Sequence, residues 1–596
     1  MFYPTLSPGA EAREVTQAWG GLDRRERGAE GSFREMENLT GDRYPLLSPR
    51  TPRRRVFAGA GPVRGLCVRE GHLLCVVGTA LYIDGMPARD FSLPSGEASE
   101  TFPDYGPECP CQMVSMGAWV VFFPDKKYFN LMEYLDTSRP TAEVGDKGSL
   151  EATVNLSPSS ENQVTYELCS RDGTVYGSLP TSPPEAPEEG ELWLDGDTLK
   201  TWASGLWEEI PQVYVKISAP GIGRGFSRYD GVELRLTGVP WGTGDSVPDF
   251  ACLEQAEPGY IVVPGTVTGT RVQTGGQVFL RRGVPDMDYV VECGNRLWGC
   301  RYGYVFDHQL GANRVVNEIY ASALGDFKNW NQFRGLSTDS YAASRGSGGP
   351  FTGAVTYQGH PTFFKAGCIE TVYPSETGAH QMVTTSCRGC LPGTLAEVDE
   401  VLYYCTGREV VAFDGSYPRS VSRALGPLAE TTGCAGRLGQ KYYLQLPGQG
   451  LLVLDTAAGL WHREDNPGAT AFAGDGRRLY FARGGEIWQP EGGGSEAVAW
   501  YAETGPLGLS LAGSKFLSRL TLRLRLEPGA WADVYLSTDE GPWEHKGHLA
   551  ASPRLRSQTL PVLPRRCDTL RLRLEGQGDC QVYSLAKTIE EGSDVW

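Results

Sequence analysis

Seven histidines and fifteen cysteines are the side chains in this 596-residue sequence best suited to metal binding or nucleophilic chemistry. Only two histidines lie close together, His545 and His548, in a segment rich in turn-forming residues. They could ligate a metal ion as a pair, but an exposed loop is the simpler interpretation. No Gly-x-Ser-x-Gly, His-Glu-x-x-His or Gly-x-x-x-x-Gly-Lys motif is present, so the sequence does not indicate those hydrolase, metalloprotease or phosphate-binding sites.

The cysteines form two close pairs, Cys109–Cys111 and Cys387–Cys390. Neither pair has a second cysteine or histidine pair at the spacing of a zinc site, so we expect no metal and no other cofactor. The odd total and the strand-like surroundings of most cysteines favour reduced, buried thiols in a protein made in a cytosol over a disulfide framework.

The segment Ser537–Trp543 (STDEGPW) is similar to the Asp-box hairpin of sialidase-type propellers, although it is one residue shorter. The complete box is itself a structural turn, and a sialidase site would also need clustered arginines with a tyrosine and an acid. Adjacent carboxylates lie in polar sequence and indicate solvated surface; they are Glu188–Glu189, Glu208–Glu209 and Glu590–Glu591. We therefore expect no catalytic residues and a protein that is not an enzyme.

Basic residues gather in two places, at 50–55 and at 564–573. Neither cluster has the interleaved aromatic side chains or the groove-filling helix that nucleic-acid binding would use. The chain as a whole is acidic, with a net charge of −17 and a pI near 5.1. This negative charge disfavours a protein whose whole surface binds nucleic acid. We expect salt bridges between subunits instead, and the candidate interface residues are Arg24, Arg25, Arg50, Arg53, Arg54 and Arg55.

The elements that would position these residues are short β-strands. In 290–333, short alternating runs are closed by Gly, Asn or Asp, with the period of a strand. Variants of this unit recur about seven times at a spacing of about 35–45 residues, which is the repeat of a four-stranded propeller blade. The sequence therefore predicts an all-β fold, a β-propeller of about seven blades formed by residues 59–147 and 286–497. The 76 glycines and 40 prolines fit so many turns.

Three segments interrupt or flank the repeats. Residues 148–285 combine Pro- and acid-rich sequence with strand patterns and predict an inserted β-sandwich. Residues 498–596 alternate apolar and charged side chains and predict a C-terminal antiparallel β-sandwich. Residues 1–58 predict an extended arm that packs along the body, mediates assembly, or does both. The longest apolar run, Trp119–Phe123, is too short to span a membrane, and the N-terminus shows no signal peptide.

Several stretches resemble a known family of tailed-phage and prophage virion proteins, in which an N-terminal pattern precedes a propeller. They are Gly20–Arg25, Gly31–Asn38, Tyr44–Arg50, Asn295–Cys300, Asn317–Trp330, Tyr501–Gly505, Pro564–Asp568 and Glu591–Asp594. The resemblance covers both ends and the middle of the chain but not the 148–285 insert. It implies a role similar to the tail nozzle, or packaged-DNA stabilisation protein, of short-tailed phages, which forms a ring beneath the portal and adaptor.

From this resemblance we expect a virion tail component that is made in the host cytoplasm. Copies of it would form a homo-oligomeric ring, and six-fold symmetry is the candidate. Its partners would be portal, adaptor or other tail proteins, and genomic DNA would pass without sequence-specific binding. An acidic channel suits that passage, because a basic lining would bind DNA through counterion release. Two alternatives remain: a tail-tip protein that binds or cleaves carbohydrate through the insert or the C-terminal sandwich, and a minor tail protein of a long-tailed phage.

Overall fold

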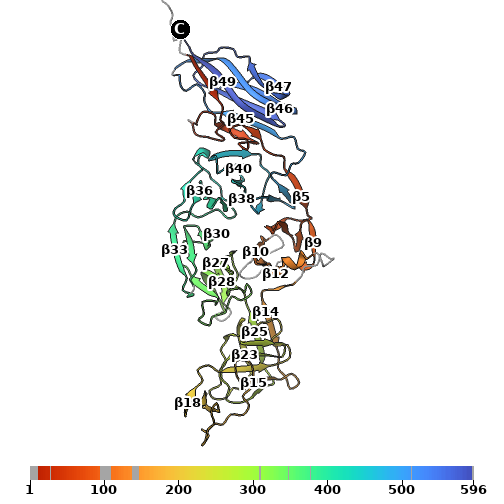
Figure 1. The fold of residues 1–596 in the computed structure, drawn as a ribbon, viewed down its shortest axis with the longest axis vertical. Helices are drawn as coiled ribbons and strands as arrows, with labels where there is room; N and C mark the ends of the chain where they lie inside the picture. Colours follow the sequence, from red (N-terminus) through yellow and green to blue (C-terminus); the bar gives the residue numbers. More distant parts are fainter. Residues whose placement is uncertain are drawn as a thin grey trace, which may run out of the picture. The chain divides into compact units, whose positions relative to one another are not determined.

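The computed structural model is built almost entirely from antiparallel strands (Figure 1). It describes residues 11–26, 28–93, 109–136, 146–307, 311–346, 348–375, 377–511 and 513–592. Within these ranges the helices are α1 (Leu131–Tyr134) and the 3₁₀ turn η1 (Arg423–Leu425). No helix of the described ranges is long and apolar enough to cross a bilayer.

Seven four-stranded sheets, counted over the described residues, correspond to the predicted repeats. Their strands are β6 (Val63–Arg69), β7 (His72–Val77), β8 (Ala80–Ile83) and β9 (Met86–Ser92); β10 (Gln112–Met116), β11 (Trp119–Phe123), β12 (Lys127–Asn130) and β13 (Lys147–Ser149); β26 (Tyr289–Glu292), β27 (Leu297–Asp307), β28 (Ala312–Ala321) and β29 (Tyr341–Ser344); β30 (Phe351–Tyr357), β31 (His360–Lys365), β32 (Cys368–Tyr373) and β33 (Gln381–Ser386); β34 (Ala396–Val398), β35 (Val401–Cys405), β36 (Val410–Phe413) and β37 (Arg419–Ser420); β38 (Cys434–Leu438), β39 (Lys441–Leu446), β40 (Gly450–Asp455) and β41 (Leu460–Glu464); and β42 (Ala471–Gly474), β43 (Leu479–Arg483), β44 (Glu486–Gln489) and β5 (Arg54–Ala58). The predicted all-β propeller class is confirmed.

The chain divides into two compact units. One comprises residues 1–87, 364–369 and 385–596, and the other comprises residues 88–363 and 370–384. We call them unit 1 and unit 2. Unit 1 contains the N-terminal arm, several blades and the C-terminal domain, and unit 2 contains the remaining blade strands and the inserted domain.

The inserted domain of unit 2 is a β-sandwich, as the sequence predicts. One sheet has the order β14 (Ala152–Leu156), β25 (Gln277–Arg282), β20 (Gly231–Thr237), β21 (Phe250–Cys252); the other has the order β22 (Gln255–Glu257), β23 (Tyr260–Pro264), β19 (Tyr214–Ser218), β15 (Val164–Cys169), β24 (Arg271–Gln273). Their inward side chains share one core that includes Tyr166, Ile217 and Leu280. A separate three-stranded sheet consists of β16 (Leu192–Asp195), β17 (Thr198–Ala203) and β18 (Leu206–Glu209).

Within unit 2, a loop of the blade β26–β29 is hydrogen-bonded to the inserted domain. The Asn329 side chain accepts a hydrogen bond from the Gly231 backbone N–H at 3.1 Å and donates one to the Tyr229 carbonyl oxygen at 2.7 Å. A Cβ at Gly231 would lie 2.0 Å from the Asn331 carbonyl oxygen, so only glycine permits this approach. Beside it, the buried Asp230 carboxylate pairs with Arg282.

The C-terminal domain of unit 1 has two layers that share one long strand. β46 (Lys515–Thr538) pairs with β49 (Cys580–Glu591) before Pro528 and with β48 (Leu570–Gln577) after it. β47 (Glu544–Leu560) follows β46 along both parts, and β45 (Ala499–Thr504) extends the sheet beyond β48. Because proline has no N–H to donate, the ladder is interrupted at Pro528, where the strand changes partners. Alternate side chains of β46 and β48 are buried, as the apolar-charged alternation predicts.

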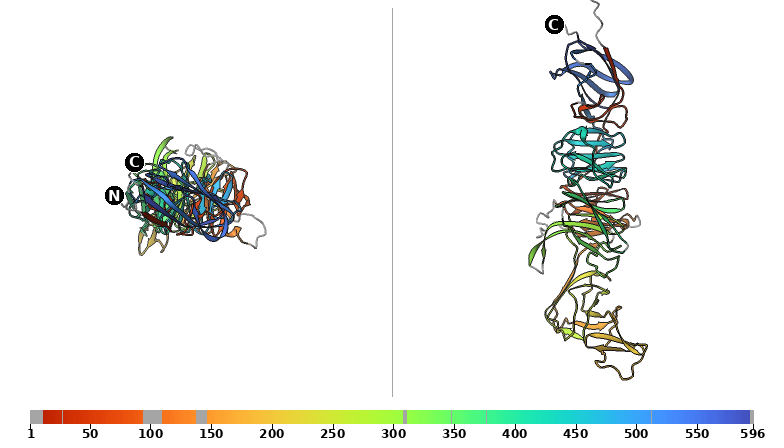
Figure 2. Two further views of the ribbon diagram at one scale, coloured as in Figure 1. Left: turned by 90° about the horizontal axis from the view of Figure 1, so that it is seen from above. Right: turned by 90° about the vertical axis from the view of Figure 1, so that its left-hand side faces the viewer.

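The N-terminal arm adds strands to two larger sheets of unit 1, and β1 and β2 form the two ends of the seven-stranded sheet of the C-terminal domain. β1 (Glu11–Thr16) pairs with β49, β2 (Phe33–Glu37) pairs with β45, and β5 completes the sheet of β42–β44. Between them, β3 (Leu39–Thr40) pairs with β4 (Ser48–Pro49). Figure 2 shows β1 in red along the blue C-terminal strands. The described part of the arm is therefore integral to the fold of unit 1, in line with the packing interpretation of its sequence.

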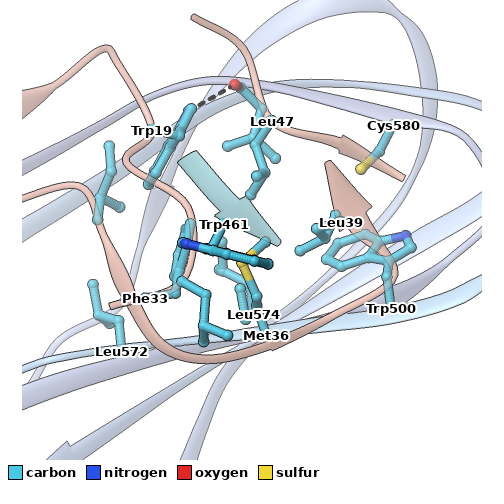
Figure 3. Packing of buried hydrophobic residues seen from close by; sticks show 14 of the residues in the cluster. Trp19, Phe33, Met36, Leu39, Leu47, Trp461, Trp500, Leu572, Leu574 and Cys580 are labelled. Atoms are coloured by element: carbon cyan, nitrogen blue, oxygen red, sulfur yellow. Dashed lines mark hydrogen bonds between the residues drawn. The ribbon is translucent and has the colours of Figure 1, made fainter. Parts of the chain in front are cut away.

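Apolar side chains of the arm fill a core shared with β41 and the C-terminal strands (Figure 3). Trp19 is 3% exposed, stacks on Phe33 at a centroid distance of 5.4 Å, and donates its indole N–H to the Val582 carbonyl oxygen at 3.0 Å. The turn before this core approaches Trp461 closely: Gly21 has φ +68, and a Cβ there would lie 2.4 Å from the Trp461 carbonyl oxygen. The arm thus packs against strands that lie more than four hundred residues further along the sequence.

Candidate functional site

The six predicted interface arginines all make contacts within the chain. Their partners are Glu35 and Gln449 for Arg24, Asp23 for Arg25, Glu464, Asp465 and Glu496 for Arg50, Glu464 and Asp465 for Arg53, Gln489 for Arg54 and Glu486 for Arg55. The side chains of Arg50 and Arg53 are 3% and 7% exposed, so they have little surface to offer a neighbouring subunit. Arg25 and Arg55 are more than half exposed, and their use between subunits stays a prediction.

Arg50 and Arg53 belong to a buried polar cluster beside β41. Lys441 bridges Asp42 at 2.7 Å and Glu491 at 2.9 Å, and His462 is 3% exposed. Burial lowers the pKa of His462 to about 4, because an imidazolium would lose its hydration there; Asp42 and Asp455 oppose this shift. A cavity of about 10 Å³ within the cluster is close to the smallest volume that holds one water. The tight packing of the cluster suits a structural role.

The histidine pair singled out by sequence meets one carboxylate. His545 Nε2 and His548 Nδ1 lie 3.0 Å and 2.9 Å from the same Asp533 oxygen, and both rings are about half exposed. Hydrogen bonds from the two histidines lower the pKa of Asp533 against the effect of burial. In the parts of the chain that the structure describes, no group of three or more His, Cys, Asp or Glu side chains could hold a metal ion. The fifteen cysteines are free thiols, and most are buried.

The near-Asp-box forms the turn between β46 and β47. The Asp539 carboxylate accepts hydrogen bonds from the backbone N–H groups of Asp568 and Thr569, at 2.7 Å and 2.9 Å. It therefore ties this turn to a neighbouring loop, whereas an Asp-box acid caps its own turn. Trp543 lies 5.4 Å from the Arg571 guanidinium in a cation–π contact. These contacts are structural ones.

In the blade β26–β29, the strands β27 and β28 extend beyond β26 and β29 as a two-stranded ribbon (Figure 2, right). β27 pairs with β28 as far as Asp307 and Ala312, but β26 reaches only to Cys300 and β29 only to Glu318. Tyr304 and Val315 face each other across this ribbon and are 64% and 65% exposed. An isolated two-stranded ribbon is marginally stable in water, and its free edges can pair with another strand. The ribbon is therefore a candidate assembly element.

The three-stranded sheet β16–β18 has two different faces. Leu194 and Leu199 are buried in the core of the inserted domain, while Trp193, Trp202 and Trp207 share the opposite face and are partly exposed. Sequence reasoning singled out Glu208–Glu209 here but missed the tryptophans. Their alternation with leucines around the two turns at 196–197 and 204–205 was the available signal.

Two larger cavities lie among the described residues. One of about 370 Å³ lies in unit 2, where Phe250 and Phe333, which are 61% and 59% exposed, line it together with Arg334. The other, of about 250 Å³, lies in unit 1 between residues 28–32 of the arm and the loop 505–510. In the second cavity the buried Lys587 ammonium is neutralised by Glu14 and Glu30, which suits a structural ion pair.

Comparison with known proteins finds matches among solved structures, at low identity. No family model and no curated protein matches the sequence. Solved structures that match include an exo-β-1,3-galactanase from Phanerochaete chrysosporium (9% identity, TM-score 0.21, 50% of this chain and 94% of that chain) and Hsv2 from Kluyveromyces lactis (7%, 0.24, 68% and 97%). Another is a glycoside hydrolase family 43 arabinoxylan arabinofuranohydrolase from Bacillus subtilis (9%, 0.18, 69% and 98%).

The expectation that the chain is not an enzyme is contradicted by these matches, because the solved structures of similar fold include glycoside hydrolases. The absence of familiar sequence motifs was the basis of that expectation, and it does not exclude an enzyme. At such low identities and TM-scores the likeness concerns the fold alone and assigns no reaction to this chain.

Proposed function

We propose that this chain is a structural component of a phage-type tail and that copies of it associate into a ring. The observation that carries the proposal is the ribbon of β27 and β28, in which Tyr304 and Val315 are exposed and no described strand pairs with the outer edges of 303–307 and 312–316. A second copy of the chain could cover the exposed side chains and pair with a free edge.

The resemblance of the N-terminal, middle and C-terminal motifs to virion proteins supports the tail assignment, and the role would be that of a nozzle or connector through which DNA passes. The net charge of −17 agrees with such a role, since an acidic wall repels the phosphate backbone and lets it slide. Portal and adaptor proteins would be the neighbours of the ring.

Electron microscopy and sedimentation of the purified full-length chain test this proposal, alone and with portal and adaptor. We expect rings for the wild type and monomers for a Tyr304→Asp, Val315→Asp double variant, because buried carboxylates would oppose the contact. Tyr417→Asp is the matched control, since Tyr417 is 61% exposed and lies elsewhere in the fold. Monomers of the wild type under all conditions, or rings unaffected by the double variant, would contradict the proposal.

A second candidate function is carbohydrate binding or cleavage at a tail tip, and the tryptophan face of β16–β18 is the observation that favours it. Cleavage has a direct assay, the release of new reducing ends from oligosaccharides incubated with the full-length chain. Release that is absent from a mock purification would favour this candidate over a purely structural component.

A further inference from the structure

The tryptophans of β16–β18 form a continuous aromatic surface. Trp207 lies in the centre, with its ring centroid 5.4 Å from that of Trp193 and 5.3 Å from that of Trp202. Both contacts are edge-to-face, with interplanar angles of 69° and 65°. We call this surface, Trp193, Trp202 and Trp207 with their neighbours on the same face, the tryptophan platform.

Charged side chains stand on the same face of the sheet. Lys200 pairs opposite Trp193, lies 4.9 Å above its ring, and bonds the Asp195 carboxylate at 2.6 Å. Glu209 pairs opposite Lys200 on the other neighbouring strand and is exposed. The platform thus combines flat apolar rings with hydrogen-bonding groups of both signs.

A purely structural explanation accounts for only part of this arrangement. Trp202 and Trp207 are directly opposite each other, and such a cross-strand pair stabilises a small hairpin. Trp193 lies on β16, outside the hairpin of β17 and β18, and its buried indole N–H has no acceptor among the described residues. A buried donor without a partner is unfavourable, so the third ring is not explained by the fold of the sheet alone.

We infer that the tryptophan platform binds a neutral oligosaccharide. The C–H faces of pyranose rings are apolar and flat enough to stack on indole rings, while the ring hydroxyls can bond Asp195, Lys200 and Glu209. Charge selects against the other common ligands of exposed aromatic rings: the carboxylates Asp195 and Glu209 are exposed on the platform face and disfavour nucleic acid and anionic glycans. The inference deepens the second candidate function, carbohydrate binding, and does not depend on the ring assembly.

Isothermal titration of the full-length chain with short neutral oligosaccharides of glucose, galactose and N-acetylglucosamine tests the inference. We expect at least one of these probes to bind, and Trp193→Ala and Trp207→Ala each to weaken that binding on the order of tenfold or more through loss of a stacking ring. Lys200→Ala gives a second variant that keeps all three rings, and it should weaken binding less.

Trp241→Ala is the matched control, because Trp241 is 38% exposed in the same inserted domain and packs on Tyr166 outside the platform. It should leave binding unchanged. Circular dichroism establishes that each variant is folded, and Trp193→Phe replaces Trp193→Ala if the latter is not. The inference is overturned if none of the neutral probes binds, if sulfated or phosphorylated glycans bind in their place, or if the platform variants bind as tightly as the control.

Discussion

The Arg53 guanidinium lies 2.7 Å from the Glu464 carboxylate, and both side chains are more than nine-tenths buried. Arg53 belongs to the N-terminal arm and Glu464 ends β41, so the pair links segments about four hundred residues apart. Burial raises the pKa of the Glu464 carboxyl, and the nearby positive charges of Arg53 and Arg50 oppose that rise. A pair so placed stabilises the fold only while both partners remain.

Removing one partner of this pair should be costly. We expect Arg53→Ala to lower the free energy of unfolding of unit 1 by about 3 kcal/mol, because Glu464 would keep only Arg50 as a charged partner. Urea denaturation measures the loss. Arg54→Ala is the control, since Arg54 is an exposed neighbour that bonds only Gln489 among the described residues, and it should cost about 0.5 kcal/mol or less. Equal losses for the two variants would show that burial of the pair is unimportant.

His462 should make unit 1 sensitive to acid. The unfolded chain protonates this residue near its ordinary pKa of 6.5, whereas burial lowers the pKa in the folded chain to about 4. Between these values the unfolded chain binds more protons, so the free energy of unfolding falls as the pH is lowered from about 6.5 towards 4. The loss attributable to His462 at pH 4.5 is about 2.5 kcal/mol.

Comparison with His462→Gln isolates this effect, because the other charged groups of the cluster, Glu464, Asp42, Asp455 and Lys441, are present in both proteins. Denaturant unfolding from pH 7 to pH 4.5 should show a steeper loss for the wild type than for the variant. Parallel stability curves would mean that the pKa of His462 in the folded chain stays near its ordinary value.

Trp19 should hold the arm in place. Trp19→Ala removes the stacking on Phe33 and the hydrogen bond to Val582, and we expect unfolding of unit 1 to become easier by about 3–5 kcal/mol. Thermal unfolding and limited proteolysis near the N-terminus are the measurements. Tyr44→Ala serves as the control because Tyr44 is 54% exposed in the same arm. A wild-type proteolysis pattern for Trp19→Ala would argue against this role.

Gly231 should control the docking of the inserted domain on its blade loop. An added methyl group would displace the Asn331 carbonyl and weaken the hydrogen bond between Asn329 and Gly231, so Gly231→Ala should expose the junction to proteases. Gly269→Ala is the matched change in the same domain, since nothing lies within 4 Å of its added Cβ. Identical digestion of the two variants would refute the proposed constraint.

The sequence by itself determined the fold class. Strand alternation and turn residues recur in each blade. Because strands next to each other in sequence pair as hairpins, the local pattern predicts the blade sheets apart from the β5 strand, which comes from the arm. The Pro- and acid-rich sequence and the apolar-charged alternation likewise predicted the inserted and C-terminal sandwiches.

Only the tertiary structure decided how distant residues meet. The buried partners of Arg50 and Arg53, the pairing of the arm with both C-terminal layers, and the closing of the sheet β42–β44 by β5 all join segments several hundred residues apart. The tryptophan platform likewise required the register of three strands, which places Trp193, Trp202 and Trp207 on one face. Contacts of this kind depend on the folded path of the chain, and no periodicity within a local stretch of sequence encodes them.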